Sequence, residues 1–153
     1  MDWNYLLWRF DGRISRQTFW IAFLAVAAAE FLIHFVVTAN GDERLSSVVS
    51  LAFGYPECAI LAKRGHDRNV STWVPVAFYA YSSLIDFLFI VGAGGTQEEP
   101  NALLVGLTIP WIVFTLVLLI DFGCRKGTVG PNRYGPDPLG PRFLTRHNGS
   151  GRD

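Results

Sequence analysis

Four ionisable side chains lie inside stretches of the chain that are otherwise apolar, and they are the first candidates for chemistry. Glu30 and His34 are one helical turn apart, Asp86 lies in a later stretch, and Glu57 lies between them in sequence. Because ionisable groups in hydrocarbon are costly, they normally face the interior of a helical bundle. An imidazole close to carboxyl groups can exchange a proton with them, so Glu30, His34 and Asp86 are candidates for a proton or cation relay.

A purely structural role for the same residues is the simpler interpretation. They could hydrogen-bond across helices as a fixed polar clamp, or His34 and Asp86 could be shallow enough to reach interfacial water. At 1.5 Å per residue, Glu30, His34 and Asp86 lie about 18 to 24 Å from the helix ends that carry the basic loops, so they could meet. Glu57 is expected to be satisfied by snorkelling or by a hydroxyl group.

Three polar segments, residues 10–16, 63–69 and 127–138, hold most of the remaining chemistry. Their arginines could form a pocket for a phosphate-bearing headgroup or a small anion, together with a histidine and a tyrosine. In the alternative, Asp67 and Asp137 pair with the arginines, and the segments form an ion-pair network that locks the loops. The candidate anion or headgroup site consists of Arg13, Arg16, Arg64, His66, Arg68, Arg133 and Tyr134.

Catalytic and metal sites find little support in the sequence. His66 and Asp67 form a pair also seen among the ligands of metal phosphohydrolases, but such a site needs further ligands. The other histidines are His34, in an apolar stretch, and His147, near the C-terminus. No GxSxG or GxxxxGK[ST] motif is present. We therefore expect no enzymatic activity, no catalytic residue, no cofactor and no metal, and the net charge of zero gives no reason to expect a nucleic-acid partner.

Long apolar stretches must position these side chains. Half of the 153 residues are hydrophobic and 17 % are charged, whereas soluble domains contain about 25 % charged residues. A helix needs about 20 apolar residues to cross the hydrocarbon core of a bilayer. Four stretches satisfy this length, and the short connections between them predict antiparallel neighbours in an all-α, polytopic four-helix transmembrane bundle. The predicted spans are residues 19–39, 45–62, 70–91 and 102–122.

The distribution of Lys and Arg predicts the orientation of the bundle. Twelve of the 13 basic residues fall before the first predicted span, between the second and third, or after the fourth, and Arg44 is the exception. Basic residues near span ends are retained on the cytoplasmic side of a membrane. We therefore expect a multi-pass protein of the bacterial inner membrane with both termini in the cytoplasm.

Small residues predict which span lies at the centre. In lipid, helices associate through close backbone approach at small side chains. Span two carries such a residue at every fourth position, so we place it at the centre, and Ala25 and Ala29 form a shorter ridge on span one. The ridge on span two consists of Ser46, Ser50, Gly54, Cys58 and Ala62.

The two ends of the chain carry weaker signals. Trp3, Leu6, Leu7 and Phe10 recur at helical spacing, which predicts a short interfacial helix before span one, although a frayed arm is the alternative. Residues 1–142 are predicted to form a single membrane domain. Residues 143–153 are rich in Gly, Arg, Ser and Asn and are predicted to be a disordered cytoplasmic tail.

The three polar segments together resemble a bacterial inner-membrane family known as domain of unknown function 805. Its members share the motifs GRxxRxx[FY]W, RLHDxxxSGW and NRYGxDP, which correspond to residues 12–20, 64–73 and 132–138. The resemblance covers about residues 9 to 138. Two departures are visible, because Gly65 replaces the usual leucine and Thr72 the usual glycine. The resemblance implies a small inner-membrane protein and brings no reaction, ligand or cofactor with it.

Two functions fit these patterns. The first is a non-enzymatic membrane protein that organises lipid, anionic phospholipid in particular, or a protein partner through the basic face. A membrane-protein partner or a homo-oligomer is compatible with this role. The second is a small transporter or ion-conducting unit that uses Glu30, His34 and Asp86.

Overall fold

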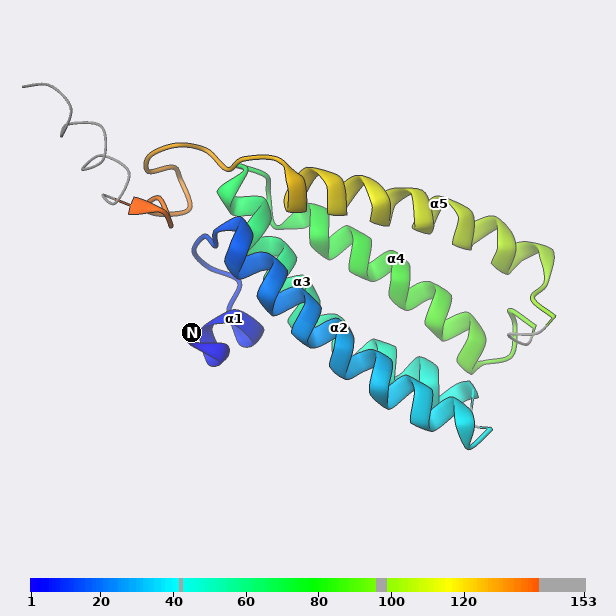
Figure 1. The fold of residues 1–153 in the computed structure, drawn as a ribbon. Coiled ribbons are helices and arrows are strands. Elements are labelled where there is room, and N and C mark those ends of the chain that lie inside the picture. Colours follow the sequence, from blue (N-terminus) through cyan, green and yellow to red (C-terminus); the bar gives the residue numbers. More distant parts are fainter. Residues whose placement is uncertain (42, 96–98, 141–153) are drawn as a thin grey trace, which may run out of the picture.

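A computed structural model describes residues 1–41, 43–95 and 99–140 of the chain. These residues form an all-helical bundle with a short N-terminal helix, which confirms the predicted fold class (Figure 1). Four helices, α2 to α5, are long and apolar enough to cross a membrane when the last is counted together with the turns that follow it. The elements are α1 (Trp3–Trp8), α2 (Arg16–Ala39), α3 (Glu43–Asp67), α4 (Trp73–Ile90), α5 (Ala102–Leu118) and the π-helix η1 (Leu119–Cys124).

Three of the helices begin at a side-chain cap. Asp2, Ser15 and Asn101 each have extended backbone angles and accept a hydrogen bond from the N–H three residues later. Such caps satisfy one of the N–H groups that a first helical turn leaves without an intrahelical partner. They fix where α1, α2 and α5 start, and the start of α2 lies three residues before the predicted start of the first span.

Helix α3 lies at the centre of the bundle and packs against α1, α2 and α4, as its small residues predicted. Ser46, Gly54, Cys58 and Ala62 are all buried. Gly54 lies directly against the ring of Tyr79 on α4, and a Cβ at this position would overlap that ring. The absence of a side chain at Gly54 therefore allows α3 and α4 to approach closely.

The prediction that small residues on the first span form a packing surface was wrong. Ala25 and Ala29 are exposed, and the buried residues of α2 are Phe19, Ala22 and Val26. The larger side chains at the start of α2 fill the space beside α3, so the contact does not depend on the two alanines.

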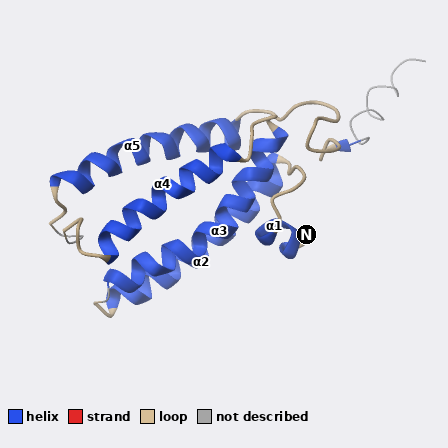
Figure 2. Ribbon diagram, turned by 180° about the vertical axis from the view of Figure 1, so that it is seen from behind, coloured by secondary structure: helices blue, strands red, loops and turns tan. Residues whose placement is uncertain are grey.

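The bundle is closed at one end and open along part of its length. At the end that carries the N-terminus, η1 packs back against α2 and α3, and the indole Nε1 of Trp20 donates a hydrogen bond to the carbonyl of Gly123 at 3.1 Å. Further along, α5 packs mainly against α4, and α2 and α5 lie at opposite edges of the bundle (Figure 1). The view from behind shows α1 beside the closed end (Figure 2).

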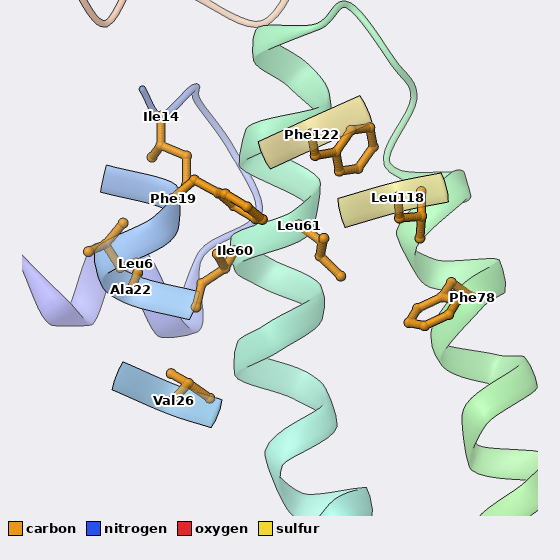
Figure 3. Close-up of a cluster of buried hydrophobic side chains, with 10 residues drawn as sticks. All are labelled: Leu6, Ile14, Phe19, Ala22, Val26, Ile60, Leu61, Phe78, Leu118 and Phe122. Atoms are coloured by element: carbon orange, nitrogen blue, oxygen red, sulfur yellow. The ribbon is translucent and has the colours of Figure 1, made fainter. Parts of the chain in front are cut away.

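The buried apolar core is concentrated near the closed end. Figure 3 shows its side chains around Ile60 and Leu61 of α3, with Leu6 of α1 and Phe122 of η1 among them. By contrast, Phe31 and Phe35 in the outer half of α2 are exposed, as are Ile109 and Val113 on α5. These side chains are suited to contact lipid tails. The apolar core thus packs the closed end tightly, and the basic segments lie there as well.

The main departure from the predicted boundaries is the end of the second span. It was predicted to end at residue 62, with the segment from residue 63 in a loop, but α3 continues to Asp67. Lys63 and Arg64 remain in the helix although they are fully buried. They can do so because backbone carbonyls and a carboxylate satisfy their charged groups.

Candidate functional site

The polar end of the bundle, here called the cap, is built from residues 9–16, 63–72 and 123–140. At its centre Asp67 pairs with two arginines that come from different parts of the chain. The Arg13 guanidinium donates to Asp67 Oδ1 through Nε at 3.1 Å and Nη2 at 2.7 Å, and Arg64 Nη1 donates to Asp67 Oδ2. At most 5 % of any of these three side chains is exposed. One buried carboxylate is therefore shared by two buried guanidinium groups.

Backbone carbonyls take up the remaining donors of Arg13. Its Nη1 donates to the carbonyls of Gly130 at 2.7 Å and Gly135 at 3.3 Å, and its Nη2 donates to that of Thr128 at 2.7 Å. All three acceptors lie in residues 127–137, here called the strap. Arg13, at the entry to α2, thus holds the strap against the bundle.

Arg64 ties the ends of two other elements to α3. Its Nε donates to the carbonyl of Phe122 at 2.5 Å, and its Nη2 donates to that of Arg125 at 2.6 Å. A longer bond of 3.5 Å joins its Nη1 to the carbonyl of Ile14. Phe122 lies in the last turn of η1, where carbonyls have no intrahelical partner, and Arg64 supplies a donor to its carbonyl.

The strap also contacts Asp67 directly. Both the backbone N–H and the hydroxyl of Thr128 donate to the Asp67 carbonyl, at 2.7 Å and 2.9 Å. Gly127 lies so close to the carboxylate that a Cβ would overlap it. Within the strap and just beyond it, the backbone N–H groups of Gly130 and Leu139 donate to Asp137 and lower its pKa. Asp137 therefore shapes the strap itself, and it forms no ion pair with an arginine within residues 1–41, 43–95 and 99–140.

His66 is enclosed by the cap and stacks on Tyr134. The two rings are 3.8 Å apart between centroids and nearly parallel, at 6°. Nδ1 lies 3.0 Å from the Gly12 carbonyl, and Nε2 lies 2.6 Å from the Thr72 hydroxyl. Because a carbonyl can only accept, Nδ1 carries the proton, and in neutral His66 Nε2 accepts from Thr72.

The two departures from the family motif fit this local structure. Thr72, in place of the usual glycine, supplies the hydroxyl that completes the hydrogen bonding of His66. Gly65 stands in place of the usual leucine, and a Cβ at this position would lie only 3.2 Å from the Phe122 ring. A leucine there would therefore require Phe122 to shift.

Lys63 is a buried cation that the sequence pattern did not single out. Its side chain is fully buried, and its Nζ donates to the carbonyl of Leu6 at 2.8 Å and to that of Arg9. The ammonium also lies 5.4 Å from the centre of the Tyr5 ring. These contacts dock α1 onto α3. A lysine directly after an apolar stretch is typical of a loop. The carbonyls of Leu6 and Arg9 and the ring of Tyr5 offset part of the cost of burying Lys63.

The residues predicted to bind an anion do not line one common cavity. Arg13, Arg64 and His66 are buried and bound within the cap. Arg68 donates to Asp121 at 3.0 Å and to the Lys126 carbonyl at 2.7 Å, and its buried Nε has no hydrogen-bond partner among the described residues. The exposed basic side chains at the cap surface are Arg9, Arg16, Arg125, Lys126 and Arg133.

A second polar region lies between the helices. A cavity of about 630 Å³, here called the groove, is lined by residues of α2, α3, α4 and α5. Glu30, Glu57 and Asp86 each contribute a carboxyl group to it. Glu30 lies close enough to Glu57 and to Asp86 for its charge to act on both of them. The hydroxyl of Tyr79 donates to Glu57 Oε2 at 2.7 Å.

The sequence predicted part of this arrangement. Glu30, His34 and Asp86 were placed at similar depths, where they could meet. Glu30 and Asp86 both line the groove, whereas His34 is not among its lining residues. Glu57 was expected to be satisfied by snorkelling or a hydroxyl, and that hydroxyl belongs to Tyr79. The predicted cluster did not include Glu57, because depth along α3 does not reveal which side of the helix faces α2.

Hydroxyl and indole groups complete the polar lining of the groove. Trp111 Nε1 donates to Ser82 Oγ at 2.6 Å, and Ser82 donates to the carbonyl of Phe78 at 3.2 Å. The rings of Phe78 and Trp111 are stacked, with centroids 6.2 Å apart. Most of the remaining lining is apolar, so the groove offers a few polar groups on an otherwise hydrophobic wall.

Comparisons with known proteins match nearly the whole chain. The family profile described as protein of unknown function (DUF805) matches residues 7–136. The uncharacterized protein YiiR of Escherichia coli K12 is 28 % identical over 146 residues, which cover 94 % of this chain and 95 % of YiiR. Inner membrane protein YhaH of the same strain is 27 % identical over 150 residues, covering 90 % of this chain and 97 % of YhaH. No solved structure gives a significant match.

Proposed function

Since this chain belongs to the DUF805 family and is an integral membrane protein, we propose that it is a non-enzymatic protein of the bacterial inner membrane that gathers anionic phospholipid at its cap. The observation that carries this proposal is that the basic residues of the cap form two groups, one buried and one exposed. The guanidinium groups of Arg13 and Arg64 are buried and bound by Asp67 and by backbone carbonyls. By contrast, Arg16, Arg125, Lys126 and Arg133 have exposed side chains, and Arg125 stays exposed although it pairs with Asp121. The cap then faces the cytoplasm, in accord with the positive-inside rule.

The exposed aromatic residues support a position at headgroup level. Trp8 and Trp73 are 60 % and 76 % exposed, and both lie at the ends of helices beside the cap. Tryptophan is enriched where a membrane meets water. Each basic side chain near an anionic surface is attracted by about 1 kcal/mol. The buried ion pairs hold these exposed groups on a fixed frame, so the cap can select headgroup charge without reorganising.

Tryptophan quenching tests this proposal directly. The full chain is reconstituted into nanodiscs of phosphatidylcholine and phosphatidylglycerol, with bromine on the acyl chains of one lipid or the other. Trp3, Trp8, Trp20 and Trp73 all lie near the cap. We expect brominated phosphatidylglycerol to quench more strongly than its share of the lipid would predict. This excess should fall at least twofold when Arg16, Arg125, Lys126 and Arg133 are changed to Gln.

The control is Arg44→Gln, which removes an exposed charge at the opposite end of α3 and should leave the excess quenching unchanged. Added salt should reduce the excess in the unaltered protein, because exposed charges are screened. Quenching in proportion to lipid content would contradict the proposal. If quenching followed lipid content and an acidic protein co-purified in a way that required the same four residues, the cap would be assigned to a protein partner instead.

A second candidate function is ion or proton conduction, and the groove is the observation that favours it. Glu30 and Asp86 line one cavity within the apolar spans, as such a role requires. In proteoliposomes, a proton or cation current should disappear in Asp86→Asn and persist in Asp11→Asn, which changes an exposed acid of the cap. No current above that of empty liposomes would remove this candidate and leave the lipid proposal intact.

A further inference from the structure

The groove has the dimensions and walls of a ligand site. Its volume of about 630 Å³ lies within the range of about 300–1,000 Å³ that is typical of small-molecule pockets. All four long helices line it. Because α2 and α5 have no extensive packing interface with each other, the groove is open on the side between them. A ligand could therefore enter from the bilayer.

The ionisable side chains that line the groove are mostly acidic. Glu30, Glu57 and Asp86 come from three different helices, and among the described lining residues there is no lysine, arginine or histidine to balance them. Tyr79 offers Glu57 a hydrogen bond but no charge. Acidic groups within membrane spans normally face a partner or a counter-charge. The complementary occupant is therefore cationic.

The spacing of these groups argues against a bare metal ion. In the part of the chain that the structure describes, no three His, Cys, Asp or Glu side chains are arranged to hold a metal. The three carboxyl groups thus line the groove without forming a common coordination site. An ammonium group does not need such a common site, because it can donate to one carboxylate while the charges of the others attract it.

The apolar part of the groove indicates that the occupant has an apolar part as well as a charge. Leu104, Phe89 and Ile109 line it beyond the carboxyl groups, and Phe78 and Trp111 provide aromatic surface. A small hydrated cation would leave these walls uncovered. An alkyl or aryl chain attached to the ammonium group would cover them.

We propose that the groove binds an amphiphilic primary amine that enters from the bilayer between α2 and α5. The ammonium group lies among Glu30, Glu57 and Asp86, and the apolar chain extends along α4 and α5. This site is separate from the cap, and it does not depend on the lipid preference proposed above or on ion conduction.

Dansylcadaverine is a suitable probe because it joins a primary amine to a fluorophore that brightens in apolar surroundings. The full chain in maltoside micelles is titrated with dansylcadaverine and, in parallel, with its N-acetyl derivative, which has the same fluorophore and chain but no charge. We expect saturable binding of the amine, with an affinity at least tenfold higher than that of the acetylated compound. This comparison uses the unaltered protein and cannot be confused with misfolding.

Substitutions then locate the amine. Asp86→Asn and Glu30→Gln should each weaken dansylcadaverine binding at least fivefold and leave binding of the acetylated probe unchanged. Asp11→Asn is the matched control, because it makes the same acid-to-amide change at an exposed site in the cap and should have no effect. Circular dichroism confirms that each variant is folded. Equal affinity for the two probes, or full amine affinity in the folded Asp86→Asn and Glu30→Gln variants, would overturn the proposal.

Discussion

Replacing Asp67 with Asn is expected to lower the free energy of unfolding by about 3–5 kcal/mol, because it leaves two buried guanidinium groups without their counter-charge. Asparagine has nearly the shape of aspartate, so packing is preserved while the charge is lost. Arg13 and Arg64 would keep their carbonyl acceptors, but both would remain buried as uncompensated cations. Unfolding in mixed micelles of maltoside and SDS, followed by circular dichroism, gives the free-energy difference.

Asp11→Asn is the control for this loss of an ion pair. Asp11 pairs with Arg9 at 2.9 Å, but both side chains are more than half exposed. Exposed pairs contribute about 0–1 kcal/mol, so this variant should unfold almost as the original protein does. If Asp67→Asn were equally mild, the buried cluster of Asp67, Arg13 and Arg64 would not be what stabilises the cap.

A double-mutant cycle separates the charge effect from a general loss of fit. In an Arg13→Gln background one of the two buried cations is already absent, so Asp67→Asn should then destabilise the protein by clearly less than it does alone. Strictly additive effects would show that Arg13 and Asp67 act independently, in conflict with the 2.7 Å contact between them.

The spans could be predicted from the sequence because hydrocarbon imposes a simple requirement on the chain. A crossing helix must be apolar over a fixed length, and each of the four predicted spans overlaps one helix of the structure. The centre of the bundle was predictable for the same reason, since Gly54 and its small neighbours mark the surface where backbones can approach.

The cap could not be predicted in detail because its bonds join distant residues. Arg13 reaches carbonyls 115 to 122 positions away, and no local pattern identifies a carbonyl acceptor. The motifs showed that arginine, histidine and aspartate are concentrated there. They did not show that the segment from Lys63 to Asp67 stays helical, since its burial depends on acceptors supplied by α1, η1 and the strap.

The cap and the groove are linked by the way the bundle closes. Arg64 and Trp20 bind the turn after α5 to α3 and α2, which joins these three long helices at one end. Among the described residues, no equivalent set of contacts draws α5 toward α2 along the groove. The cap therefore fixes the relative positions of the helices while their apolar halves stay apart, and this separation leaves room for the groove.

The contact between α3 and α4 is the other place where a single substitution should have a large effect. Gly54→Val is expected to destabilise the bundle by about 2–3 kcal/mol, because the new side chain would overlap the ring of Tyr79. Tyr79 cannot move away freely, since its hydroxyl is bound to Glu57. The same mixed-micelle unfolding measurement applies.

Gly106→Val makes the same change on α5, where no atom of the part of the chain that the structure describes lies within 4 Å of the added Cβ. Glycine and valine differ by less than about 1 kcal/mol in helix propensity, so this control should alter stability only slightly. Gly54→Val should also push Tyr79 away from Glu57, and it should therefore change dansylcadaverine binding in the protein that remains folded. Equal stability of the two variants would mean that the α3–α4 contact yields easily and that the close approach at Gly54 does not determine the stability of the bundle.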